Sequence, residues 1–223
     1  MRCSLLPGLL SSYQHNVKRQ HGRVRFFETG LVFERRGDGI TQESRLGGLI
    51  AGSQLPKSWS NRGEDSDFYD LKGDVEVLLG LGGKTGQLNF FPAAETAYHP
   101  GQCAEIRSLA DERIGVLGAL HPTIQRELDL DHSVFVFELR LDRLLRARMP
   151  NVKTLSKYPE VHRDLAIVID EAVSADSIST LVKASAGEFL TDLRIFDVYQ
   201  GDAIAKGQKS VALGLTWQHP SRT

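Results

Sequence analysis

The stretch RIFDVYQGDAIAKGQKSVALGLTWQHPSRT, residues 194–223, decides the architecture expected for the C-terminal part of the chain. Apolar and polar residues alternate up to residue 200 and again in residues 209–218, which predicts two half-buried strands. The polar segment between these stretches contains glycine and predicts a turn. Upstream, residues 163–170 predict another strand and residues 174–187 predict a helix. The order strand–helix–strand–strand matches the first part of a ferredoxin-like β-α-β-β-α-β unit. We therefore expect a ferredoxin-like domain that is truncated before its last helix and strand.

Strand alternation assigns faces to the last two predicted strands. One side of residues 209–218 is apolar and the other is small and polar; the apolar side carries Val211, Leu213, Leu215 and Trp217. In residues 195–199, alternation places Phe196 and Val198 under the predicted helix. It places Ile195, Asp197 and Tyr199 on the open side with Ser210. An exposed ring beside a carboxylate can seat a nucleobase, because the ring stacks and the carboxylate reads a base edge. A surface tyrosine beside a loop-capping aspartate fits the same pattern.

Composition narrows the class of protein. The chain has 223 residues, of which 41% are hydrophobic and 25% are charged, and its formal net charge is -1. These values are typical of a soluble globular protein, and the net charge provides no overall attraction to nucleic acid or membrane. Cys3 and Cys103 are isolated, which argues against a disulfide framework and a zinc site and favours a cytoplasmic location. No apolar run approaches the ~20 residues of a membrane span.

The N-terminal part of the chain predicts a mixture of strands and helices. A helix is expected at about residues 6–20, with apolar residues at helical spacing. Strands are expected at 24–33, with a bend at Gly30, and at 44–54, followed by a helix at 68–81. Next come a strand ending at Pro92 and a hairpin that turns near Ala110. The last elements expected are a short helix at 121–130 and, from residue 133, a strand that runs into a helix. A proline-containing stretch without periodicity, residues 148–159, predicts a boundary between domains 1–150 and 151–223.

Several blocks of the sequence resemble one family. They are MRCSLLPGLL (1–10), FFETGLVFERRG (26–37), SDFYDLKGDVEVLLGL (66–81), YPEVHRDLAIVID (158–170) and IFDVYQGDAIAKGQKSVALGL (195–215). In this order they resemble the C-terminal part of the β subunit of bacterial phenylalanine–tRNA ligase. The resemblance implies an α+β chain, with a class II synthetase-like antiparallel-sheet domain at 1–150 that has lost catalysis and a ferredoxin-like anticodon-binding domain at 151–223. It also implies that Met1 is an internal methionine of a longer chain.

The same resemblance implies an α2β2 assembly that charges tRNA with phenylalanine, using ATP and magnesium at an active site on the α subunit. Class II enzymes clamp phosphate and carboxylate with an Arg-x-Glu pair. The matching place here holds Phe33-Glu34-Arg35-Arg36 and lacks that pair, so no bidentate phosphate clamp is available. We therefore expect no catalytic, cofactor-binding or metal-binding residues in this chain. The glycine-rich segment 80–84 follows a predicted helix instead of starting one, so it does not resemble a phosphate loop.

The resemblance places the tRNA anticodon contacts at Asp197, Tyr199 and Ser210, with Tyr199 as the stacking ring. Lys209 ranks below them because alternation turns it to the opposite face. Arg163 belongs to an Arg-Asp pair that matches a family signature, although a structural ion pair or strand-end hydrogen bonding is the favoured interpretation of that pair. Residues 151–223 hold eight Lys and Arg against nine Asp and Glu. Anticodon binding would therefore depend on stacking and base-edge contacts more than on phosphate neutralisation. A free-standing RNA-binding or assembly module is the alternative function.

The N-terminal helix is the candidate contact with the α subunit. Its apolar stripe consists of Leu6, Leu9, Leu10, Tyr13 and Val17. Residues 1–36 also carry seven Lys and Arg against Glu28 and Glu34, which fits either a tRNA-backbone patch or a surface facing the α subunit. The amphipathic stripe favours the subunit interface. In the isolated chain we expect the stripe to be partly exposed or used in a self-contact.

Overall fold

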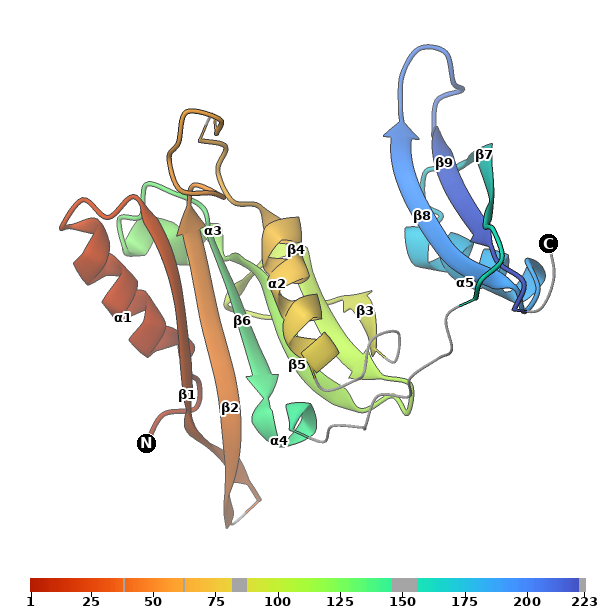
Figure 1. The fold of residues 1–223 in the computed structure, drawn as a ribbon. Helices are drawn as coiled ribbons and strands as arrows, with labels where there is room; N and C mark the ends of the chain where they lie inside the picture. Colours follow the sequence, from red (N-terminus) through yellow and green to blue (C-terminus); the bar gives the residue numbers. More distant parts are fainter. Residues whose placement is uncertain (38, 62, 82–87, 146–155, 221–223) are drawn as a thin grey trace. The chain divides into compact units, whose positions relative to one another are not determined.

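The computed structural model describes all residues except 38, 62, 82–87, 146–155 and 221–223. The chain divides into two compact units, Met1–Pro150 and Asn151–Thr223, and each has an antiparallel sheet (Figure 1). The α+β class expected from the sequence is confirmed. Most of the proline-containing boundary stretch, and the glycines that follow the helix at 68–81, lie outside the described residues. No helix in the described part of the chain is long and apolar enough to cross a membrane.

The first unit is a six-stranded sheet in the order β1-β2-β6-β5-β4-β3. Its strands are β1 Arg23–Arg36, β2 Gly39–Gly52, β3 Leu88–Pro92, β4 Tyr98–Ser108, β5 Arg113–Leu120 and β6 Val134–Arg140. Strand β1 pairs with β2 in one register along its whole length, and Gly30 lies opposite Arg45 within that register. The expectation that Gly30 separates two strands is therefore wrong, because the pairing with β2 continues through it.

Helices cover both faces of this sheet. They are α1 Leu6–Val17, α2 Phe68–Leu81, α3 Pro122–Glu127 and α4 Leu141–Leu144. Alternate residues of β6 point to opposite sides: Val134 and Val136 pack in the cluster that contains α1, whereas Phe135 and Phe137 pack in the cluster that contains α2. The sheet is therefore buried on both faces in its centre, which makes this unit a three-layer arrangement.

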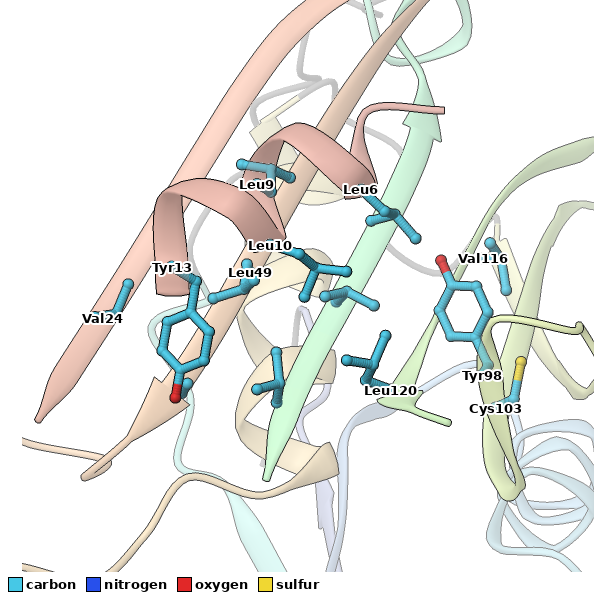
Figure 2. Packing of buried hydrophobic residues seen from close by; sticks show 13 residues of the cluster. Leu6, Leu9, Leu10, Tyr13, Val24, Leu49, Tyr98, Cys103, Val116 and Leu120 are labelled. Carbon is cyan, nitrogen blue, oxygen red and sulfur yellow. The ribbon is translucent and has the colours of Figure 1, made fainter. Parts of the chain in front are cut away.

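The apolar stripe of α1 belongs to the core of this unit. Leu6, Leu9, Leu10 and Tyr13 are buried, and Val17 packs against the same cluster. Figure 2 shows the stripe facing the strands, with Leu10 near Leu49 and Tyr13 beside Val24. The expectation that the stripe stays partly exposed is wrong, because the β2, β5 and β6 side chains provide its cover. These five residues therefore pack inside their own unit and no longer support a subunit interface at α1.

A buried carboxylate ties the start of α1 to the sheet. Glu138 of β6 has only 7% of its surface exposed. Its Oε1 accepts a hydrogen bond of 2.6 Å from the backbone N–H of Leu5, and its Oε2 lies 2.8 Å from Nη1 of Arg45. The first N–H groups of a helix lack intrahelical acceptors, so Glu138 satisfies one of them while Arg45 balances its charge.

The second unit has the order β7 Val161–Asp170, α5 Ala175–Ser185, β8 Leu190–Tyr199 and β9 Gln208–Trp217. Its three strands lie in the order β7-β9-β8, so the last strand of the described segment is central. Ser174 caps α5 by accepting a 3.1 Å hydrogen bond from the Ser177 N–H, as N-cap serines do. Ile178 of α5 packs on Val211 and Leu213 of β9. This is the strand–helix–strand–strand order predicted from the sequence, and the ferredoxin-like assignment is confirmed.

The buried carboxylate makes a stability prediction for the first unit. Replacing Glu138 with alanine leaves the Leu5 N–H without its acceptor and removes one partner of Arg45. We expect the free energy of unfolding, measured in urea, to fall by about 2–4 kcal/mol. Glu28→Ala is the matched control, because the Arg2–Glu28 pair is solvent-exposed and should cost under about 1 kcal/mol. Equal losses for the two variants would contradict the structural role of Glu138.

Candidate nucleic-acid interface

The sheet of the second unit has one face covered by α5 and one open face. Val211, Leu213 and Leu215 of the central strand β9 are buried on the covered side. Directly paired residues of antiparallel strands share a face. The open side therefore consists of Ser210, Ala212, Gly214 and Thr216 of β9 together with the residues of β7 and β8 that pair with them. A layer of small residues therefore runs along its middle.

The structure brings Asp197, Tyr199 and Ser210 together on this open face. Tyr199 of β8 pairs directly with Ser210 of β9, and Asp197 pairs with Ala212. Tyr199 keeps 46% of its surface exposed, and Asp197 is also exposed. A ring, a carboxylate and a hydroxyl thus stand on adjacent positions of neighbouring strands, where a flat ligand can contact all of them.

Lys209 and Arg163 lie on the other face. Arg163 pairs with the buried Leu215, and its Nη1 donates a 3.1 Å hydrogen bond to the carbonyl of His162. Lys209 donates from Nζ to the carbonyl of Glu171 at 2.8 Å. Alternation correctly predicted that Lys209 lies on the face opposite Ser210. The pairing of β7 with β9 also places Arg163 on that face, away from the open side. The structure does not bring these two cations together with the predicted anticodon contacts.

A β-bulge in β8 overturns one prediction about the faces. Ile195 pairs with Leu213 and Asp197 pairs with Ala212, so Phe196 is an extra residue with no partner of its own. Ile195 therefore packs against the buried cluster under α5, whereas Phe196 remains 48% exposed. Phe196 was expected under the helix and Ile195 on the open side, and the bulge exchanges them. A single-residue irregularity of this kind leaves no signal in an alternating sequence.

Val198 keeps the side that alternation assigned to it, but it is not covered. It pairs with Val211 and so shares the face of α5, yet 54% of its surface is exposed. The helix covers the end of β8 near Leu193 and Ile195 and does not reach Val198.

Charge on the open face is mainly negative. The pairing of β7 and β8 with β9 places Asp164, Asp192 and Asp197 on this side, with Arg194 among them. His162 also lies here, where its Nδ1 is 2.9 Å from the hydroxyl of Thr216. A surface with this balance attracts a polyanion weakly, so affinity for one must come from other contacts.

The ring of Tyr199 rests on the backbone of the following loop. A Cβ atom built on Gly201 would lie 2.7 Å from Cζ of Tyr199, much closer than the 3.5–4.0 Å or so at which carbon atoms attract. Glycine at position 201 is therefore what allows the ring to lie there, and the ring is held without a hydrogen bond to its hydroxyl among the described contacts.

The first unit has a charged cavity of about 330 Å³ on the sheet face that α1 partly covers. It is lined by Cys3, Glu34, Glu43, Arg45, Glu95, Arg113, Gly115, Val116, Glu138 and Arg140. Its arginines are bound to carboxylates: Arg45 to Glu138 and Glu43, Arg113 to Glu95 and Glu105, and Arg140 to Glu43. Burial lowers the pKa of Arg45, but the hydrogen bonds and charges of Glu138 and Glu43 outweigh burial and raise that pKa above its ordinary value.

Family comparison assigns both units. The model of the phenylalanyl tRNA synthetase beta chain CLM domain matches residues 1–141. The chain belongs to this family. The model of the ferredoxin-fold anticodon binding domain matches residues 156–223, which include the open sheet face.

Curated relatives match along the whole chain. The phenylalanine–tRNA ligase beta subunit of Pseudomonas syringae pv. tomato is 50% identical over 224 residues, which cover 100% of this chain and 28% of the relative. The beta subunits of Methylococcus capsulatus and Hahella chejuensis are 46% and 43% identical, with the same coverage. The chain thus spans 28% of the length of the curated relatives it matches.

Among solved structures, the chain is similar to pyrrolysyl-tRNA synthetase from Desulfitobacterium hafniense. The TM-score is 0.49 at 16% sequence identity, and the match covers 65% of this chain and 48% of that chain.

Proposed function

We propose that this chain is part of the β subunit of a phenylalanine–tRNA ligase and that the open face of its second unit binds the tRNA anticodon. The observation that carries the proposal is the meeting of Asp197, Tyr199 and Ser210 on the open face of a unit that matches the anticodon-binding family. The alternative, an RNA-binding or assembly module without a ligase partner, predicts no stable complex with an α subunit on co-expression.

Each of the three side chains has a distinct task at an unpaired base. The Tyr199 ring offers a stacking surface, which is sequence-tolerant because every base has a π-face. The carboxylate of Asp197 accepts hydrogen bonds only, so it selects a base edge that presents N–H donors. The hydroxyl of Ser210 both donates and accepts. Because carboxylates dominate the face, we expect affinity for tRNA to depend only weakly on salt.

Replacing Tyr199 with alanine tests the stacking contact. We expect tRNA affinity to fall by about 1–3 kcal/mol, the range for loss of one stacked base, while Tyr199→Phe keeps most of the affinity because it retains the ring. Tyr69→Ala is the matched control, because Tyr69 is an exposed tyrosine of the first unit. The measurement is a binding titration with phenylalanine tRNA. Unchanged affinity in Tyr199→Ala would make the residue an ordinary surface tyrosine.

Gly201 provides an independent test of ring position. A methyl group at residue 201 would collide with the Tyr199 ring and must displace it, while the tyrosine itself remains present. We expect Gly201→Ala to weaken tRNA binding in the direction of Tyr199→Ala and to leave the thermal unfolding midpoint within about 2 °C of the parent, because residue 201 is exposed. Gly207→Ala is not a suitable control, because the φ of 82° at Gly207 strains any side chain. Asp202→Ala, in the same loop, is the matched control. Full affinity in Gly201→Ala would show that the ring orientation is unimportant.

For the first unit we propose a supporting role without catalysis. The Arg-x-Glu pair is absent from residues 33–36, and Arg45, Arg113 and Arg140 of the charged cavity already bind carboxylates. Four glutamates in the lining would also repel a triphosphate. These residues do not fit ATP, so the proposal assigns ATP, magnesium and amino-acid activation to the α subunit of an α2β2 enzyme. The buried stripe of α1 leaves the position of the subunit contact unassigned.

The catalytic proposal is tested on the isolated chain. We expect the purified chain to show no phenylalanine-dependent exchange of pyrophosphate into ATP, because residues 33–36 lack the Arg-x-Glu pair and the cavity arginines Arg45, Arg113 and Arg140 already bind carboxylates. Adding the α subunit should produce exchange. Phenylalanine-dependent exchange by the purified chain alone would contradict the proposal.

A further inference from the structure

Phe196 occupies a position on the open face that the proposed anticodon contacts do not explain. The bulge makes Phe196 and Asp197 together oppose Ala212. A Cβ built on Gly214 would lie 3.7 Å from Cδ1 of Phe196 and 3.6 Å from Oδ1 of Asp164. Gly214 pairs with Asp164 and Arg194 on the open side, so the Phe196 ring lies on that side as well, over the middle of the sheet.

The surroundings of this ring leave it available to a ligand. Its neighbours on the central strand, Ala212 and Gly214, have little or no side chain to cover it, and 48% of its surface is exposed. The guanidinium carbon of Arg194 lies 6.0 Å from the ring centroid. The site therefore combines a π-face with a cation in a surface that is otherwise acidic, which is the pairing that sheet-based RNA binders use for a base and its phosphate.

The spacing along β8 relates Phe196 to Tyr199. Three residues of a strand span about 10 Å, and the bulge shortens that span. Tyr199 stands opposite Ser210, whereas Phe196 stands beside Gly214, so the rings are successive along one edge of the same small-residue layer. Sheets that present aromatic side chains in this way stack two or three bases of a single strand.

We propose that Phe196 is a second stacking residue, which takes the unpaired base next to the one stacked on Tyr199, with Arg194 close to the connecting phosphate. This inference rests on the proposed anticodon function and extends it from one base to two neighbouring bases of the same RNA strand. The β-bulge is the structural device that creates the second site, because a regular strand would place residue 196 under α5.

The test combines protein variants with modified RNA in the full chain. The probe is an RNA hairpin whose single-stranded loop carries the phenylalanine anticodon, together with versions in which each loop position in turn is abasic. We expect Phe196→Ala to weaken binding of the intact hairpin by about 5- to 150-fold. One abasic hairpin should bind the variant and the parent equally, because its missing base is the one that Phe196 stacks. The adjacent abasic position should instead cancel the effect of Tyr199→Ala.

Matched variants separate stacking from shape. Phe196→Trp keeps a ring and should bind as tightly as the parent, whereas Phe196→Leu keeps apolar bulk without a π-face and should bind as weakly as Phe196→Ala. Val198→Ala removes an equally exposed apolar side chain from the opposite face and should leave binding unchanged. If Phe196→Ala unfolds the unit, the comparison of the Trp and Leu variants still decides the question.

The outcomes distinguish this inference from the function it rests on. Loss of affinity in Tyr199→Ala with full affinity in Phe196→Ala overturns the second stacking site and leaves the anticodon face standing. Full affinity in both variants overturns the proposed function. Weaker binding in Phe196→Ala that no abasic position cancels would mean that the ring shapes the strand without stacking a base, which also overturns this inference.

Discussion

The register of β9 against its two neighbours is the constraint on which the second unit depends. Because β9 is central, each of its residues from Ser210 to Trp217 fixes the face of one residue in β7 and one in β8. The buried Leu213 places Ile195 under α5, and Ala212, one residue earlier in β9, places Asp197 in solvent. A slip of one residue would exchange the two faces completely, so the core contacts of Val211 and Leu213 with Ile178 also determine which groups a ligand can reach.

The charged cavity of the first unit contains arginines that are bound to carboxylates and so do not form a phosphate clamp. Arg45 lies between Glu138 and Glu43, and Glu138 also accepts the N–H at the start of α1. Removing either carboxylate would leave a partly buried guanidinium less well compensated, which is costly in a protein interior. Glu138 therefore links the ionic contacts of Arg45 to the packing of α1 on the sheet, and this is consistent with a supporting role for the unit.

Much of this fold could be predicted from periodicity and turn residues. Alternation located β9 and the buried side of Val211 and Leu213, and helical spacing located α1. The spacing of Leu6 and Tyr13 does not indicate which surface covers these side chains. An apolar helical stripe packs equally well on the sheet of its own unit or on a partner subunit. The side of Phe196 was also beyond prediction, because a bulge depends on cross-strand pairing. The side of Asp197 and Tyr199 could be predicted because both lie beyond the bulge of β8, where alternation holds again. The side of Ser210 could be predicted because β9 pairs regularly with β7 along its whole length.

We propose that RNA contacts the open face of the second unit and not the face carrying α5. Hydroxyl-radical footprinting read out by mass spectrometry tests it directly, since both faces carry exposed reactive side chains. With phenylalanine tRNA bound, we expect protection of Phe196 and Tyr199 and unchanged labelling of Leu165, Leu181 and Val198. Protection of the latter three with undiminished labelling of the two rings would contradict it.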